Sequence, residues 1–126
     1  MHGVLWGWAS GKGLIQINLT TGKGTMKYSS NLSVGDIAWS NDGRTLYIVT
    51  TDKRLYRYNP SRNTLSRIND NLPSNMEALD MRSDGLLMMG VHDSTQIRAY
   101  DPIRERFVSS QYFKTTYNDV EGIAWP

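Results

Sequence analysis

The sequence contains no cysteine among its 126 residues. This absence excludes a disulfide framework and metal sites built from thiolates, although it does not fix the cellular compartment. No run of about 18 apolar residues is present, so we expect no membrane-spanning helix and no membrane partner. The chain also does not open with a basic segment followed by an apolar one, and we therefore expect no signal peptide.

Motifs of nucleophilic and phosphate chemistry are missing as well. There is no Gly-x-Ser-x-Gly elbow, and the glycine-rich turns 11–13 and 22–24 lack the spacing of a phosphate-binding loop. The two histidines, His2 and His92, are far apart in the sequence and form no catalytic set. These absences favour a protein that is not an enzyme.

The charged residues are balanced and scattered. The net charge is +2, and the apolar and charged fractions of 39% and 21% are typical of a soluble globular protein. The nearest approach to a basic cluster is Arg98, Arg104 and Arg106, which we interpret as a solvated face. Nucleic-acid binding needs a denser basic stripe. We therefore expect no nucleic-acid partner.

The sequence does contain a repeated stretch of seven residues. It occurs at Val34–Ser40, again 42 residues later at Met76–Arg82, and a third time, after 44 more residues, at Val120–Pro126. The first, fourth and sixth positions of the stretch are apolar in all three copies. A period near 40 residues, in units rich in short strands, is typical of β-propeller blades.

Each complete unit has the composition of four short strands separated by turns. In residues 34–75 the Asp-Gly pair of Asn41–Gly43 predicts a hairpin turn. Residues 76–119 repeat the plan, with Ser83–Gly85 at the corresponding place. Four antiparallel strands joined by tight turns make one propeller blade.

The first 33 residues match only the last three strands of this unit, and the final stretch has the sequence of the missing strand. We therefore predict an all-β propeller with three four-stranded blades per chain, circularly permuted by one strand. Blade 1 comprises residues 2–33 together with 120–126 of a partner chain, blade 2 comprises 34–75, and blade 3 comprises 76–119.

Three blades alone would expose two apolar faces and an unpaired strand edge. Propellers typically have about four to eight blades, and two chains of three blades give a six-bladed ring. In that ring the C-terminal strand of each chain completes the N-terminal blade of its partner, which makes a domain-swapped homodimer with two-fold symmetry. A nine-bladed trimer, and a chain that is part of a longer propeller, are the alternatives.

The sequence Ile-Ala-Trp-Ser-Asn-Asp-Gly-Arg-Thr-Leu-Tyr at 37–47, followed by Leu-Tyr-Arg-Tyr-Asn-Pro at 55–60, resembles blades of the NHL-type, quinoprotein-like and WD40-like propellers. Tyr58-Asn59 and Tyr100-Asp101 stand near the place of the Trp-Asp pair of WD40 repeats, and no Gly-His pair occurs. The resemblance implies the fold and leaves the function open, because binding modules and enzymes both use propellers.

Candidate ligand residues lie where the inner strands begin, at one mouth of the predicted channel. These are Asp36, Glu77 and Glu121. In a six-bladed ring the two glutamates would recur by symmetry, and carboxylates that converge in this way can hold Ca²⁺. Glu77 and Glu121 are thus the candidate metal ligands, and no other cofactor is expected. Alternatively, both side chains face solvent and hydrogen-bond to loop amides.

Glu121-Gly122 together with Trp125 resembles the opening motif of the gluconolactonase-like six-bladed hydrolases. In that family the glutamate is a metal ligand, so the resemblance implies a metal-dependent hydrolase as the alternative to a binding protein. The family's remaining ligands, an Asn and an Asp from separate blades, have no convincing counterpart in this sequence.

Loops supply the other candidates. Asp52, His92 and Asp93 lie on turns after the second strands, and Tyr117 lies on the loop after blade 3. We predict a non-catalytic binding or structural propeller, with a small molecule, glycan or peptide as the ligand at the channel-mouth loops.

Aromatic side chains raise a lectin as a further alternative, because exposed rings can hold the C–H faces of sugars. Trp6, Trp8 and Tyr117 are the candidates for such a role. Trp39 and Trp125 share one position of the repeat, and we expect both to pack in the core.

Overall fold

The computed structural model describes residues 4–126, apart from the side chains of Gln111 and Tyr112. These residues form eleven β-strands in three antiparallel sheets, and within each sheet the strands follow one another in chain order. No helix in this part of the chain is long and apolar enough to cross a bilayer. The predicted all-β fold is confirmed, whereas the expectation for His2 lies outside the described residues.

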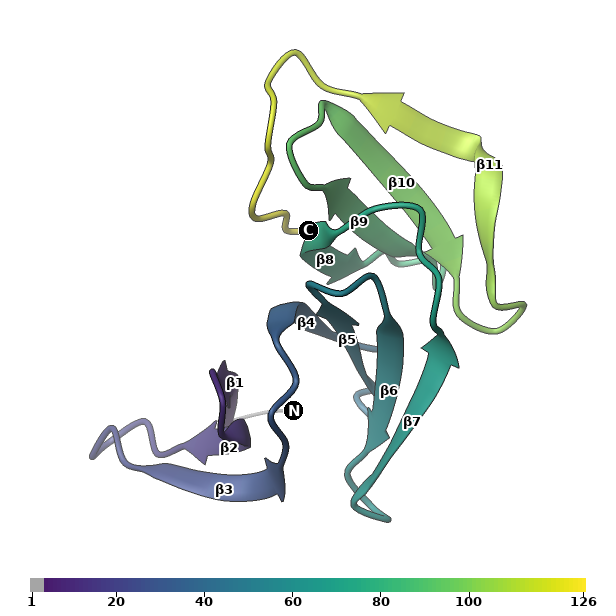
Figure 1. Ribbon diagram of the computed structural model, residues 1–126. Coiled ribbons are helices and arrows are strands. Elements are labelled where there is room, and N and C mark those ends of the chain that lie inside the picture. The colour runs from purple at the N-terminus through teal and green to yellow at the C-terminus, as the bar shows by residue number, and fades with distance from the viewer. Residues whose placement is uncertain (1–3) are drawn as a thin grey trace.

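The three sheets are the three blades, and Figure 1 shows them side by side in chain order. Blade 1 contains β1 (Leu5–Ala9), β2 (Gly13–Ile17) and β3 (Gly24–Ser29). Blade 2 contains β4 (Val34–Trp39), β5 (Leu46–Thr50), β6 (Leu55–Asn59) and β7 (Thr64–Asn69). Blade 3 contains β8 (Met76–Met81), β9 (Leu87–Val91), β10 (Gln96–Asp101) and β11 (Arg106–Lys114). The last strand, β11, has nine residues and is longer than any other strand in the described part of the chain.

Blade 1 lacks an inner strand. In the described part of the chain β1 pairs with β2 alone, so its sheet has three strands where the other two have four. Residues 120–126 form no strand in the single chain. A strand needs an adjacent edge with which to hydrogen-bond, and blade 1 lies at the other end of the row (Figure 1). Completion of blade 1 by a second chain stays a prediction.

The outer turn of every blade is built on the same side-chain hydrogen bonds. The turn follows β2 in blade 1, β6 in blade 2 and β10 in blade 3. At the start of each turn one side-chain oxygen accepts hydrogen bonds from the backbone amides two and three residues ahead. The residue is Asn18 in blade 1, Asn59 in blade 2 and Asp101 in blade 3. Asn and Asp favour turns because their side chains can close such rings. The repeat in the sequence thus becomes a repeat of turn geometry.

Two hydrophobic clusters hold the blades together, one at each interface between blades. Strand β5 contributes to both clusters because alternate side chains of a strand point to opposite faces. Leu46 and Ile48 belong to the cluster shared with blade 1, whereas Tyr47 and Val49 belong to the cluster shared with blade 3. The strand is buried throughout because it lies between two neighbours.

The segments that leave each blade follow one path. In each case a backbone amide donates a hydrogen bond of 2.9 Å to a carbonyl in the turn between the second and third strand positions. The pairs are Ser30 with Lys12, Leu72 with Lys53, and Asp119 with Ser94. The tail, residues 115–126, therefore leaves blade 3 as the chain leaves blade 2 to begin a new blade. Figure 1 shows this tail running back to the region of β8.

The tail then packs against blade 3. The backbone amide of Trp125 donates a hydrogen bond to Asp80 Oδ2. A Cβ atom built on Gly90 would lie 2.7 Å from the carbonyl oxygen of Val120. Likewise, a Cβ atom on Gly35 of β4 would lie 2.5 Å from the carbonyl oxygen of Met76, which begins β8. The tail thus approaches blade 3 as closely as β8 approaches blade 2.

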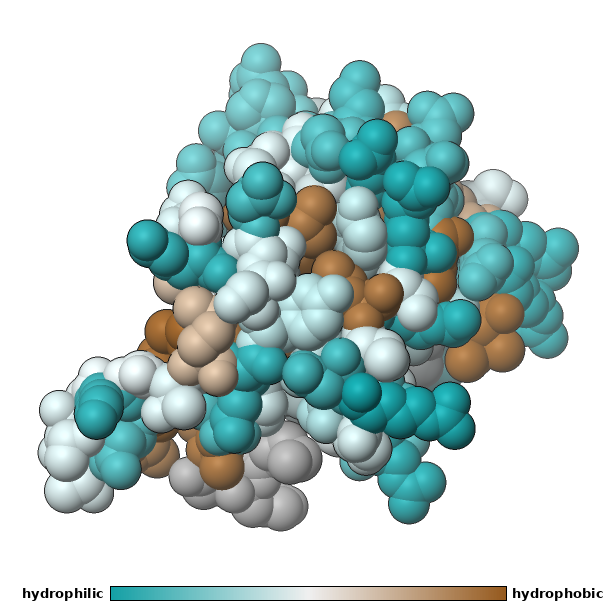
Figure 2. All heavy atoms as spheres, turned by 60° about the horizontal axis from the view of Figure 1, so that its bottom comes forward, coloured by the Kyte–Doolittle hydropathy of each residue, from teal (hydrophilic) through white to brown (hydrophobic). Residues whose placement is uncertain are grey.

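The surface is mainly polar. Figure 2 shows hydrophilic and neutral side chains over most of one face, with hydrophobic side chains in separate groups. Blade 1 contributes several of the exposed large hydrophobic residues, namely Val4, Leu5, Leu19 and Met26. Leu14 is the only buried apolar side chain in the described part of blade 1, so the incomplete blade is also the one whose apolar side chains are least covered.

Candidate functional site

Three polar side chains from separate segments meet at one edge of blade 3. Glu77 is the second residue of β8, His92 directly follows β9, and Asp119 lies on the tail. The Nδ1 atom of His92 lies 2.8 Å from Oε1 of Glu77 and 3.6 Å from Oδ1 of Asp119. The ligand atoms of all three lie within 4.8 Å of one another. We call this group the Glu77–His92–Asp119 cluster.

Backbone hydrogen bonds position the cluster. The amide of His92 donates to the carbonyl oxygen of Asn75 at 2.8 Å, which fixes the turn to the strand that carries Glu77. The amide of Asp93 donates to Oδ1 of Asp119 at 2.8 Å. Both aspartates adopt positive φ angles of 51° and 59°, a region that Asp tolerates better than most residues. The side-chain amide of Asn118 donates to Asp93 and completes the link.

Neighbouring groups shift the pKa values of His92 and Asp119 in opposite directions. The hydrogen bond to Glu77 raises the pKa of His92, and the charge of Asp119 acts in the same direction. The amide of Asp93 is the largest cause that lowers the pKa of Asp119. In both cases the hydrogen bond and the opposite charge stabilise the charged form, which is the imidazolium of His92 and the carboxylate of Asp119.

The cluster is partly open to solvent. The side chains of Glu77, His92 and Asp119 are 24%, 48% and 39% exposed. The second carboxylate oxygen of Glu77, Oε2, is buried and has no hydrogen-bond partner in the described part of the chain. A buried carboxylate oxygen without a donor is costly. The cluster therefore presents a ring nitrogen and two carboxylates to a cation or to a polar ligand.

Asp36, also predicted as a ligand residue, serves the fold. Its Oδ1 accepts a hydrogen bond from the amide of Ile37, and its Oδ2 accepts one from the amide of Leu79 in β8, both at 2.8 Å. Burial raises the pKa of Asp36, the two amides lower it, and the charge of Asp80 raises it. This carboxylate links the inner strands of blades 2 and 3.

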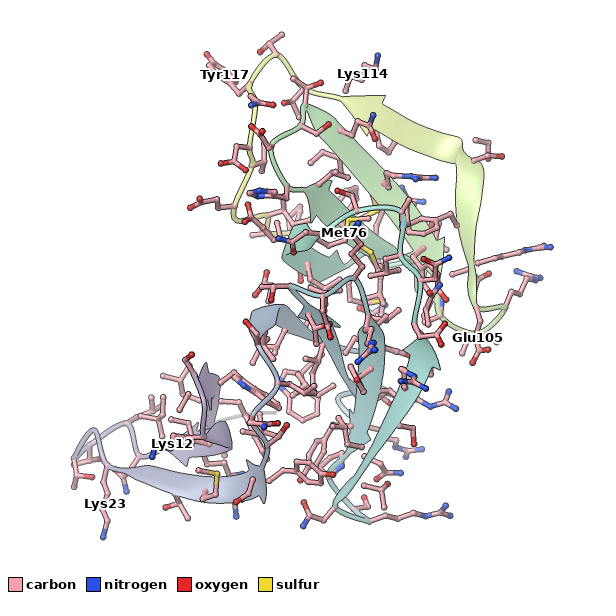
Figure 3. All side chains as sticks on the ribbon, viewed as in Figure 1. Lys12, Lys23, Met76, Glu105, Lys114 and Tyr117 are labelled. Carbon is pink, nitrogen blue, oxygen red and sulfur yellow. The ribbon has the colours of Figure 1, made fainter. Side chains whose placement is uncertain are left out.

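The structure does not bring the other candidates to the cluster, apart from Asp93. Asp52 accepts a hydrogen bond from Thr50 and pairs with Arg54 at 3.2 Å on its own turn. Tyr117 is 77% exposed and points away from the sheets, as Figure 3 shows. Glu121 is exposed and is not a member of the cluster around Glu77. The Ca²⁺ site with symmetry-related glutamates requires a second chain and stays a prediction.

The tryptophans behave differently from one another. Trp39 packs edge-on against Trp6, with ring centroids 5.3 Å apart, and Nε1 of Trp8 donates to the carbonyl oxygen of Leu32 at 3.3 Å. Trp125 is 46% exposed, with the guanidinium of Arg82 5.7 Å from its ring. Trp125 is therefore not buried in the single chain, contrary to the core position expected from the repeat.

An open groove of about 430 Å³ lies between β1 and β4. Apolar side chains dominate it, and one carboxylate joins them. Its lining residues are Val4, Leu5, Trp6, Ile37, Ala38, Trp39 and Asp80. In blades 2 and 3 the two inner strands lie directly against each other. The groove thus occupies the place where an inner strand of blade 1 would run.

Sequence reasoning missed Asp119 as a cluster member. The residue lies at the end of the loop between blade 3 and the final repeat stretch, so a channel-mouth position was predictable. Its partners were not, because Asp119 is 42 residues from Glu77 and 27 from His92. The path of the tail across blade 3 is what joins them.

Comparisons with solved structures show what fold this is. The chain is similar to a luciferin-regenerating enzyme, with a TM-score of 0.70, 18% identity, and coverage of 88% of this chain and 39% of that one. It is similar to the WD40 repeats of RRP9, with a TM-score of 0.69, 13% identity, and coverage of 95% and 38%. It is also similar to an auxiliary nutrient binding protein from Bacteroides thetaiotaomicron, with a TM-score of 0.70, 16% identity, and coverage of 94% and 29%.

No protein-family model matches the sequence, and no curated protein matches it either. The chain spans only about 29–39% of the length of these three structures. Their identities are too low to transfer an activity, but the similarity over most of this chain is a similarity of fold. The chain therefore has the β-propeller fold and comprises three consecutive blades, of which the first lacks its inner strand.

Proposed function

We propose that this chain is a binding or structural propeller, two copies of which close into a six-bladed ring with a ligand site at the channel mouth. The observation that carries the proposal is the groove beside β1. It has the position of a missing inner strand, and residues 120–126 have the sequence of that strand. One edge of β1 is unpaired and faces the groove. This arrangement supports the addition of a strand, since an unpaired edge offers free amides and carbonyls.

The repeat predicts the register of the added strand. In blade 2, Trp39 pairs with Leu46 across the first hairpin. The corresponding residues are Trp125 of one copy and Leu5 of the other. Leu5 is 48% exposed in the single chain, whereas Leu46 is fully buried. Ring closure would cover Leu5 and Trp125 together and thereby remove two exposed apolar side chains from water.

Light scattering on a size-exclusion column tests the ring. The expected mass is twice that of the 14.3 kDa chain. Leu5→Asp should reduce the mass to that of one chain, because it places a charge at the interface. Ile103→Asp is the matched control, since Ile103 is 84% exposed on the outer turn of blade 3. A wild-type protein that stays monomeric at high concentration contradicts the ring.

The proposed ligand of this propeller is a small molecule, a glycan or a peptide. The Glu77–His92–Asp119 cluster supports a polar ligand at this edge, because its side chains are partly exposed and held by backbone hydrogen bonds. A thermal-shift screen with sugars, organic acids and short peptides tests this. The thermal shift caused by a bound ligand should be lost in Glu77→Gln. It should be retained in the control Asp52→Asn, because Asp52 lies on the turn of blade 2 that corresponds to the His92 turn of blade 3.

A metal-dependent hydrolase is the second candidate. The fold similarity to a luciferin-regenerating enzyme and the presence of a histidine beside two carboxylates favour it. The test is hydrolysis of simple lactones and esters with added divalent metal. Activity that EDTA removes and that Glu77→Gln lacks would support the hydrolase, and no turnover with any metal would leave the binding proposal alone.

A further inference from the structure

The Glu77–His92–Asp119 cluster joins three segments that are distant in the sequence, and one of them is the tail. Glu77 comes from β8, His92 from the turn after β9, and Asp119 from the segment that leads to residues 120–126. Whatever binds all three side chains therefore also holds the tail to blade 3.

The spacing of the ligand atoms suits a small divalent ion. Zinc binds histidine nitrogen and carboxylate oxygen at about 2.0–2.2 Å, so neighbouring ligand atoms of a tetrahedral site lie about 3.3 Å apart. The distances from His92 Nδ1 to the oxygens of Glu77 and Asp119 are 2.8 and 3.6 Å. Both distances lie within about 0.5 Å of that spacing.

The ligand types also discriminate between ions. Imidazole suits zinc and other transition metals, whereas Ca²⁺ takes oxygen ligands at longer distances. The buried Oε2 of Glu77, which has no partner in the described part of the chain, supplies a further oxygen on the same side chain. Three protein ligands leave a fourth position open to solvent, because His92 is about half exposed.

We propose that Glu77, His92 and Asp119 bind one divalent transition-metal ion of the zinc type, and that this ion fastens the tail to blade 3. The proposal deepens the ring proposed above, because the fastened tail is the segment that would complete blade 1 of a second copy. All three ligands belong to the same chain, so the metal site does not require the ring. A monomer that binds metal and a dimer that does not would therefore separate the two proposals.

Isothermal titration of the full chain with ZnCl₂, after treatment with EDTA and buffer exchange, is the first test. We expect one site per chain. Glu77→Gln, His92→Gln and Asp119→Asn should each weaken zinc binding at least about tenfold, since even partners that only orient ligands contribute 10–100-fold. Asp52→Asn should bind zinc as the wild type does.

Two further arms make the titration decisive. His2→Ala should leave the affinity unchanged, and loss of zinc binding in this variant would overturn the proposal by placing the ion elsewhere. CaCl₂ should bind more weakly than ZnCl₂, and a preference for Ca²⁺ would overturn the choice of ion.

Hydrogen exchange of the tail separates fastening from mere binding. Zinc should slow exchange of the amides in residues 115–126, including that of Trp125, which donates to Asp80. The protection should be absent in His92→Gln. Zinc binding without this protection would contradict the fastening role.

Light scattering with and without zinc then tests the ring separately. A monomer whose tail amides are protected by zinc would support the metal site and contradict the ring.

Discussion

Blade 1 and blade 2 carry the same strand pattern in different surroundings. Leu5 begins β1 and Leu46 begins β5, at equivalent places in the repeat, yet Leu5 is 48% exposed and Leu46 is fully buried. The difference lies in the neighbours, because blade 2 has a blade on each side and an inner strand of its own, whereas blade 1 has one neighbour and no inner strand. In a propeller, burial is a property of the interface between blades and not of the blade alone.

The tryptophans give the largest expected difference between a closed and an open interface. Trp39→Ala should lower the free energy of unfolding by about 3–5 kcal/mol, because the ring packs against Trp6 in the cluster between blades 1 and 2. Trp125→Ala should cost as much only where a second copy covers Trp125. Urea unfolding at several protein concentrations measures both. A large loss for Trp125→Ala in a proven monomer would contradict this view.

The two leucines sharpen the same comparison. Leu46→Ala should cost about 2–5 kcal/mol at every protein concentration, since its side chain is fully buried within one chain. Leu5→Ala should cost little in the monomer, and the cost should rise where chains associate. Chemical unfolding monitored by tryptophan fluorescence provides the values. Equal costs for both leucines in a monomer would mean that another segment of the chain covers Leu5.

Gly35 tests the close approach of two complete inner strands. In Gly35→Ala the added methyl group would lie 2.5 Å from the carbonyl oxygen of Met76, so the strands must separate. We expect a loss of about 1–3 kcal/mol in thermal or urea unfolding. Gly122→Ala is the control, because a Cβ atom there meets nothing within 4 Å. An unchanged stability of Gly35→Ala would show that β4 and β8 tolerate a wider spacing.

The outer turns should differ least between blades, because each is closed by its own residues. The amides of Arg104 and Ile103 and the Arg104 guanidinium lower the pKa of Asp101, although burial opposes them. A lowered pKa means that this stabilisation is present above the unfolded pKa of about 3.9 and is lost as the pH falls through the folded value. The urea midpoint of Asp101→Asn should therefore fall less between pH 6 and pH 3 than that of the wild type.

Blade 2 offers the reciprocal variant. Asn59 closes the equivalent turn and has Arg62 three residues ahead, as Asp101 has Arg104. Asn59→Asp should therefore add an acid-sensitive contribution of similar size. If neither variant changes the slope of stability against pH, the charge of Asp101 contributes nothing to the turn beyond the hydrogen bonds that asparagine makes.

Much of the candidate site could not be predicted from the sequence. Glu77 and His92 were identified as candidates from their places on an inner strand and a turn, but so were Asp36 and Asp52, whose carboxylates are used within the fold. An acidic residue at a strand start has the same sequence pattern whether it faces a ligand or a backbone amide. Only the path of neighbouring segments decides which partner it meets.

From the sequence alone one can predict units of short antiparallel strands with a period near 40 residues, and the turns between those strands. The strands and turns depend on local patterns, such as alternating apolar residues and the Asn or Asp at each outer turn. Each pattern occurs in more than one unit of the repeat. The folded structure was needed to show that Asp119 joins Glu77 and His92, that Asp36 links two blades, and that Leu5 is exposed. Each of these depends on contacts between segments distant in the chain, and the free energy of such contacts is set by how whole blades pack.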